Sequence, residues 1–247
     1  MQLRLTCSLC ARQDEERTVS VEVADDGIYT IRCGEGHQSV HTLSNPKFTL
    51  LFEMGFLAYA DGYTREAVAT CAAAFEEFCR SFIGTELFSH MRDSAQRDSL
   101  LRRFLKVINR AEPQFGAFAV LYLISRGETP PFPDQKTIEF RNAVIHRGQI
   151  PSALEVVAYG DTMLRFVVPL YAELRELEQF GFAESLPQSD ALARRRQQMR
   201  ATSYYVSALD HLADRKANAS FTAAVEFAAH HGFLRQSRAG MPNLVDS

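Results

Sequence analysis

The spacing of hydrophobic residues along the chain changes near residue 44. Before that point, every second residue between 19 and 23 is valine, and another short apolar stretch follows at 28–33. The Asp-Asp-Gly sequence at 25–27 is typical of a turn between two strands. The pattern therefore predicts a β-hairpin formed by 17–23 and 28–33.

From residue 44 onward, apolar residues recur at the three- and four-residue spacing of amphipathic helices. Ser44-Asn45-Pro46 combines a capping residue with a proline near the first turn and favours a helix start. Gly148 is typical of a helix end, and Ser152 of the cap that begins the next helix. The pattern predicts helices at about 46–59, 64–82, 93–111, 113–126, 135–147, 153–179, 189–215 and 220–231.

These elements predict a mainly α protein with three parts. A small β-hairpin module covers 1–43, a helical bundle covers 44–183, and a helical C-terminal extension covers 184–247. The last residues, 241–247, are expected to be disordered. Six phenylalanines near helical spacing are expected in the core, namely Phe48, Phe52, Phe56, Phe75, Phe78 and Phe82.

Composition narrows the class of protein. Of the 247 residues, 46% are hydrophobic and 23% are charged, which is the range of globular domains. A net charge of −3 argues against a protein that coats nucleic acid through bulk charge alone. Charged residues interrupt every long apolar run, and the first residues lack the pattern of a signal peptide. We therefore expect a soluble, cytoplasmic protein.

Four residues near the N-terminus have the spacing of a metal site. Cys7 and Cys10 form a C-x2-C pair, and Cys33 precedes His37 in a C-x3-H pair. Two such knuckles joined by a hairpin are what a structural zinc ribbon requires, because Zn²⁺ prefers four tetrahedral nitrogen and sulfur ligands. His41 competes with His37 as the fourth ligand. We expect structural Zn²⁺, which supplies stability that so small a module cannot obtain from its core alone.

A second candidate site lies in the predicted helix at 135–147. Asn142 and His146 are four residues apart and therefore share one face of the helix, and Arg141 can reach the same face. The group combines a permanent cation, an amide and a side chain that titrates near neutral pH. Taken alone, it is also compatible with a surface arginine and a helix-terminal histidine.

The Arg141-Asn142…His146 pattern and its setting resemble the HEPN family (higher eukaryotes and prokaryotes nucleotide-binding domains). A short helix with an R-x4-H motif, a Gly/Pro turn and a long helix follow one another as in that family. The stretch from Tyr63 to Glu76-Glu77 resembles its first long helical hairpin, and the likeness covers about 46–180. Either Glu76 or Glu77 is a candidate partner for Arg141 across helices.

The resemblance implies an activity and a partner. Many HEPN proteins are metal-independent ribonucleases, several of them toxins or antiviral-defence effectors, with a site formed across a two-fold dimer. It implies that Arg141 and His146 are catalytic, that Asn142 supports them, that RNA is the substrate and that the chain is a homodimer. Some toxins of the family carry a tyrosine where this chain has Gly148, and a partner enzyme neutralises the toxin by modifying it. This mode of neutralisation is therefore not expected here.

Two further possibilities stay open. The chain could be a catalytically silent HEPN dimer that acts as an adaptor, or a scaffold whose zinc ribbon or C-terminal extension binds a protein or a nucleic acid. The basic run from Arg194 to Arg200 could contact RNA phosphates, although such runs more often form a solvated helix face. The chain contains no P-loop, dinucleotide fingerprint, nucleophile elbow or HExxH motif.

Overall fold

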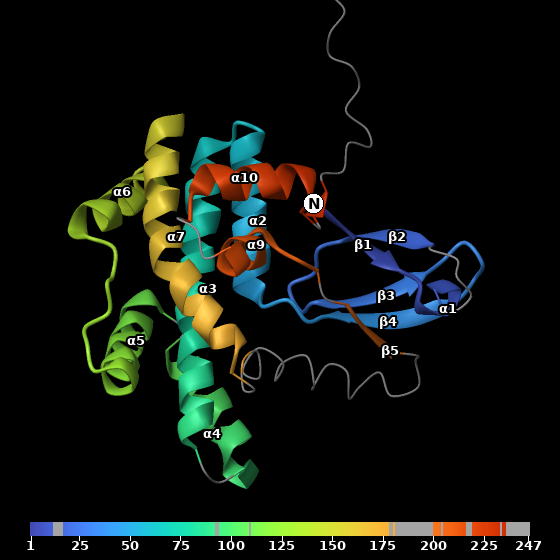
Figure 1. Ribbon diagram of the computed structural model, residues 1–247, viewed down its shortest axis with the longest axis horizontal. Helices are drawn as coiled ribbons and strands as arrows, with labels where there is room; N and C mark the ends of the chain where they lie inside the picture. The colour runs from blue at the N-terminus through green and yellow to red at the C-terminus, as the bar shows by residue number, and fades with distance from the viewer. Residues whose placement is uncertain are drawn as a thin grey trace, which may run out of the picture.

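The protein consists of a helical body from which a small β region projects to one side (Figure 1). The computed structural model describes residues 1–11, 17–91, 94–108, 110–177, 180, 200–203, 205–215, 219–232 and 234–235. Within the described part of the chain, no helix is long and apolar enough to cross a membrane.

The helical body follows the predicted pattern closely. Its helices are α2 (Lys47–Ala60), α3 (Thr64–His90), α4 (Ser94–Val107), α5 (Ala111–Arg126), α6 (Gln135–His146), α7 (Ala153–Arg175), α9 (Ala208–Arg215) and α10 (Phe221–His230). The expectation of a mainly α chain is thus confirmed. The largest departure is the second predicted helix, which was expected to end at 82 and continues to His90.

The β region contains two antiparallel hairpins instead of the single predicted one. In one, β1 (Gln2–Thr6) pairs with β2 (Thr18–Glu22), and the turn of helix α1 (Ser8–Ala11) lies between them. In the other, β3 (Ile28–Arg32) pairs with β4 (Gln38–Leu43). The predicted pairing of 17–23 with 28–33 is therefore wrong. The C-x2-C and C-x3-H knuckles each reverse the chain, so a strand pairs across its knuckle and not across the Asp-Asp-Gly turn.

Phenylalanine side chains fill the centre of the helical body, as predicted. Phe48, Phe52, Phe56, Phe78 and Phe82 are almost completely inaccessible, and Phe75 is nearly so. Phe166 of α7 lies at the meeting point, with ring centroids 5.2 Å from Phe75 and 5.6 Å from Phe118. The edge-on and tilted geometry of these pairs adds to the burial of their large apolar area. The core thus locks α7 against α3 and α5.

Local signals fix both ends of the segment that carries the second candidate site. The Asp134 carboxylate accepts hydrogen bonds from the backbone N–H and the hydroxyl of Thr137, which begins α6. Gly148 ends the helix in the left-handed conformation, with φ of +72°. Ser152 and Glu155 form a capping box at the start of α7, as the serine position predicted. The candidate helix is therefore delimited by its own sequence.

The region after residue 199 differs from the prediction. Residues 200–203 form strand β5, which pairs in parallel with β4. The helix predicted over 189–215 is therefore wrong at 200–203 and confirmed for α9, whereas 189–199 lie outside the described residues. Strand β6 (Leu234–Arg235) pairs with β1. The predicted helix at 220–231 is confirmed by α10. The basic run at 194–200 falls almost entirely outside the described residues, as does the tail at 241–247.

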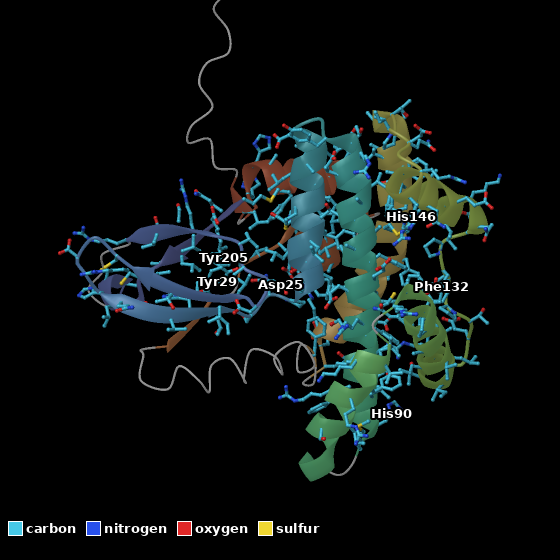
Figure 2. The ribbon with its side chains drawn as sticks, turned by 180° about the vertical axis from the view of Figure 1, so that it is seen from behind. Asp25, Tyr29, His90, Phe132, His146 and Tyr205 are labelled. Carbon is cyan, nitrogen blue, oxygen red and sulfur yellow. The ribbon has the colours of Figure 1, made fainter. Side chains whose placement is uncertain are left out.

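The C-terminal segment is held by residues that were expected to cap a helix. Asn45 accepts a hydrogen bond from the backbone N–H of Tyr205 and donates one to its carbonyl oxygen, and Ser44 donates to the carbonyl of Ser203. Helix α2 begins instead after Pro46 without a side-chain cap. The 44–46 segment therefore secures β5 beside β4, and Tyr205, which it binds, lies near Tyr29 (Figure 2).

Helix α10 is fastened to α7 where a small residue permits close approach. A Cβ atom at Gly160 would lie 2.1 Å from the ring of Phe221. The ring itself is fully buried and packs against Phe56 and Tyr59, and the Phe221 N–H donates to Asp161. Only glycine fits at position 160.

We expect Gly160→Ala to lower the free energy of unfolding by about 1–3 kcal/mol, because the methyl group would force the Phe221 ring out of its packed position. Gly116→Ala is the matched control: it is helical, has no neighbour within 4 Å of the new atom, and should gain about 0.5–1 kcal/mol. Urea unfolding followed by circular dichroism measures both. A Gly160→Ala protein as stable as the wild type would contradict this packing.

Candidate metal centre and candidate active site

The four predicted metal ligands come together at the far end of the β region. Backbone hydrogen bonds from Cys7 to Arg17 (2.8 Å) and from Ala11 to Cys7 (2.9 Å) shape the first knuckle. In the second, the Gly36 N–H donates to the Cys33 carbonyl (2.9 Å), with Gly36 at a φ of +81°. A left-handed residue is needed there to turn the chain tightly, which explains the glycine.

The ligand atoms have the separations of a tetrahedral site. Cys10 Sγ lies 3.8 Å from Cys33 Sγ and 3.4 Å from His37 Nδ1, and Cys7 Sγ lies 3.9 Å from the same nitrogen. All four ligand atoms lie within 4.8 Å of one another. Zn–S bonds of about 2.3 Å and Zn–N bonds of about 2.0 Å imply tetrahedral edges of about 3.8 Å and 3.5 Å. The residues present therefore fit a four-coordinate metal ion.

The chemistry of the donors also fits a soft divalent cation. The three sulfurs are buried, whereas His37 is partly accessible. Burial and the two neighbouring thiols raise the pKa of Cys10 to about 12. Burial alone would raise the pKa of Cys7, but backbone N–H groups of Cys10 and Leu9 lower it below its usual value. A cation held among these sulfurs would stabilise their thiolate forms.

His41, the alternative fourth ligand, is used elsewhere. Its ring is buried in β4, with Nε2 3.0 Å from the hydroxyl of Ser39 and Nδ1 3.3 Å from that of Ser203. Burial lowers the pKa of His41, which favours the neutral ring. Among the described residues, the metal-binding group includes His37 and not His41. His41 instead helps to attach β5 to β4.

The second candidate site lies on the opposite side of the helical body, where α6 covers α3. The Arg141 guanidinium donates to the Glu76 carboxylate of α3 and, at 3.1 Å, to the side-chain oxygen of Asn142. Both members of the ion pair are about one-quarter to one-third exposed. The structure therefore brings Arg141 and Asn142 into direct contact and selects Glu76 as the partner, while Glu77 faces Arg80.

His146 lies in the last turn of α6, exposed and on the same side of the molecule as Phe132 (Figure 2). Its spacing of four residues from Asn142 places the two on one helix face. His146 is near enough to the Arg141–Glu76 pair to lower the pKa of Glu76 slightly, and we call these residues with Asn142 the Arg141–His146 cluster. Among the described residues, no hydrogen bond or ion pair joins the His146 ring to the other members. The cluster offers a cation for an anionic group and an accessible ring for proton transfer.

Sequence reasoning left the surroundings of Glu76 unassigned. Burial raises the pKa of Glu76, Arg141 lowers it, and Glu112 and Glu77 raise it again, with a net shift upward. The buried side chain of Gln114 donates to the Glu76 carbonyl and ties α5 to the same point of α3. The role of Gln114 in joining α5 to α3 is visible only from this interhelical contact, because nothing in its local sequence indicates it.

Family models, curated proteins and solved structures yield no match to this chain. The resemblance to HEPN proteins therefore stays a prediction based on the motif and its helical setting.

We expect the purified protein to carry about one metal ion per chain, because the four-ligand cluster is complete. Cys10→Ser should abolish metal retention and His37→Ala should weaken it strongly, whereas His41→Gln should leave the metal content unchanged. Elemental analysis after dialysis against a weak chelator measures this. Loss of metal in His41→Gln with full retention in His37→Ala would reverse the ligand assignment.

Proposed function

We propose that the chain is a ribonuclease of the HEPN type that cleaves single-stranded RNA at the Arg141–His146 cluster. The observation that carries the proposal is the Arg141–Glu76 pair, which fixes a guanidinium on the motif helix, whose last residue is the exposed His146. A fixed guanidinium is suited to a phosphate, since its fork matches two oxygens. The exposed ring of His146 leaves room for a large substrate.

The proposed reaction needs no bound metal ion as nucleophile, because RNA carries its own in the 2′-hydroxyl. The 2′-oxygen attacks the adjacent phosphorus and the bond from phosphorus to the 5′-oxygen breaks, leaving a 2′,3′-cyclic phosphate and a free 5′-hydroxyl. One group accepts the 2′-hydroxyl proton and another donates a proton to the departing oxygen. His146 can serve either role, and Arg141 stabilises the additional negative charge on the phosphate oxygens.

A two-fold homodimer would supply the second proton-transfer group. One chain offers one His146, whereas the reaction uses an acid and a base at once. Two apolar side chains are strongly exposed next to the motif, Ile150 at 80% and Leu154 at 83%. Both lie beyond Gly148, on the turn that follows the motif helix and the first turn of α7. We propose that a second copy covers them and brings the two histidines together.

We further propose that the metal ion is zinc and that its role is structural. Three thiolates and one imidazole at tetrahedral spacing are the ligands that zinc prefers, and they fill all four positions. A filled coordination sphere leaves no place for a substrate. Zinc would hold the two knuckles together and thereby the strands that flank them.

A catalytically silent adaptor is the alternative, and one observation favours it. The Arg141 fork is already engaged by Glu76 and Asn142, so a phosphate must compete with these partners. In an adaptor the ion pair would only attach α6 to α3. The cleavage experiment below distinguishes the two functions.

We expect the wild-type protein to cut single-stranded RNA and His146→Ala to lower the rate by about 10²-fold or more, because proton transfer contributes 10² to 10⁴. Arg141→Lys should also be impaired, because an ammonium cannot form the bidentate contact. His90→Ala is the matched control: another partly exposed histidine, at the opposite end of the helical body (Figure 2). Gel analysis of a labelled RNA measures the rates.

The structural metal must survive this test, so each variant is compared with wild type in metal content and helical circular dichroism. If His146→Ala cuts as fast as the wild type, the activity is not at this cluster. If the wild type cuts no RNA, the adaptor function replaces the nuclease proposal.

We expect Leu154→Glu to convert a wild-type dimer into a monomer and to lower RNA cleavage, because a charge would be buried in the proposed interface. Val107→Glu is the control, since Val107 is 72% exposed on α4, away from the motif. Light scattering at micromolar concentration gives the mass of each protein. A monomeric wild type that cleaves RNA would contradict the dimer.

A further inference from the structure

A hollow of about 320 Å³ lies beside the motif, between the proline-rich connection and helices α6 and α7. Its volume is within the range of small-molecule and cofactor sites. Its wall combines three kinds of chemistry: aromatic and proline rings, two threonine hydroxyls, and one charge of each sign. The lining residues are Pro131, Phe132, Pro133, Asp134, Thr137, Thr162, Arg165 and Phe166.

The hollow continues the surface of the Arg141–His146 cluster. Thr137 precedes Arg141 by four residues on α6, so the two lie on one helix face about 6 Å apart along the axis. On α7, Tyr159 packs against Phe140 with ring centroids 5.6 Å apart and interacts electrostatically with Arg141 and Glu76. One and two turns further along α7 are Thr162 and Arg165. Phe132, which lines the hollow, and His146 lie on the same side of the molecule (Figure 2).

The wall of the hollow is rigid where it is aromatic. The rings of Phe132 and Phe166 are stacked, with centroids 5.7 Å apart and planes 8° apart, and Phe132 also contacts Phe118 at 5.3 Å. Phe166 belongs to the central core and is almost fully buried. Phe132 is half-buried, so part of it faces the hollow. A flat apolar group placed there would meet a surface that need not rearrange.

The polar wall is held in fixed positions as well. Arg165 is exposed and its guanidinium donates to the Thr162 hydroxyl at 3.2 Å, which orients the fork. The hydrogen bonds from Thr137 lower the pKa of Asp134, so its carboxylate is ionised at neutral pH. A ligand with an anionic group would bind at Arg165 and turn its hydrogen-bond donors toward Asp134.

We infer that this hollow binds the nucleotide unit next to the phosphate that is cleaved, with its phosphate at Arg165 and its base against Phe132 and the neighbouring prolines. A nucleotide combines a planar base, sugar hydroxyls and an anion in one unit, which are the chemistries that the wall offers. The inference rests on the proposed ribonuclease function, whose substrate it positions.

The test separates binding from cleavage. A fluorescent single-stranded RNA with 2′-O-methyl riboses cannot be cut by the proposed reaction, and its anisotropy reports binding to the full-length protein. Arg165→Ala should weaken binding about tenfold, the value of one charge-assisted hydrogen bond. It should also reduce the slope of log Kd against log salt concentration by about 0.7, the share of one phosphate contact. Arg165→Lys should fall between wild type and Arg165→Ala.

Matched controls identify the origin of any change. Arg103→Ala removes an exposed arginine from α4, away from the hollow, and should bind as the wild type does. His146→Ala should bind the probe normally while cutting unmodified RNA slowly. Since Arg165 is exposed, its substitution should not alter helical circular dichroism.

The outcomes distinguish this inference from the proposed function. A wild-type protein that cuts RNA together with an Arg165→Ala variant that binds and cuts equally well overturns the subsite and leaves the nuclease intact. Binding that depends on Arg165 without any cleavage overturns the nuclease and leaves a nucleotide-binding hollow. Failure of the wild type to bind the probe overturns the subsite.

Discussion

Burial of the long helix α3 is the constraint on which the other elements depend. α3 is packed against α2, α4, α5, α6 and α7, so it has contacts around most of its circumference. Buried residues follow one another along it from Ala67 to Glu86. A helix that is apolar on most sides is stable only when other helices cover it. The order of the surrounding helices, and with it the position of the motif helix, follows from this requirement.

Where α6 covers α3, the contact includes the Arg141–Glu76 ion pair, and the candidate active site lies there. Breaking an exposed ion pair costs about 0.2–1 kcal/mol, and breaking a buried one about 3–5 kcal/mol. The Arg141–Glu76 pair is between these limits, since about one-quarter to one-third of each side chain is accessible. Such a pair can hold a guanidinium in place and still admit a competing anion. Burial raises the pKa of Glu76, so its carboxylate is protonated at a higher pH than usual. The ion pair with Arg141 therefore weakens as the pH falls.

The β region and the helical body share one core, and this couples the candidate metal centre to the rest of the molecule. Leu3, Leu5, Ile31 and Leu43 belong to the same buried cluster as the phenylalanines of the helices. Cys7, Cys10 and Cys33 form a small separate cluster at the far end of the strands. After residue 199 the chain adds β5 to one hairpin, forms α9 and α10, and then adds β6 to the other hairpin. In α2, fully buried Glu53 accepts a hydrogen bond from Ala208 at the start of α9. Metal binding would therefore stabilise strands that the C-terminal segment also holds.

The sequence by itself determined the elements whose signals are local. Helix boundaries near Asp134, Gly148 and Ser152 follow from capping chemistry, which involves only neighbouring residues. The three cysteines of the candidate metal centre were predictable for the same reason, because each knuckle is defined by a spacing of two or three residues. The motif on α6 was visible as a spacing on one helix.

Tertiary structure alone decided the contacts between distant residues. Strand partners could not be read from alternation, since β2 has the same pattern whether it pairs with β1 or with β3. The choice of Glu76 over Glu77 depended on which side of α3 meets α6, and the choice of His37 over His41 on where β5 attaches. Residues 200–203 form a strand because β4 offers them an open edge. Each of these outcomes is set by packing between elements far apart in the chain, which the local sequence does not encode.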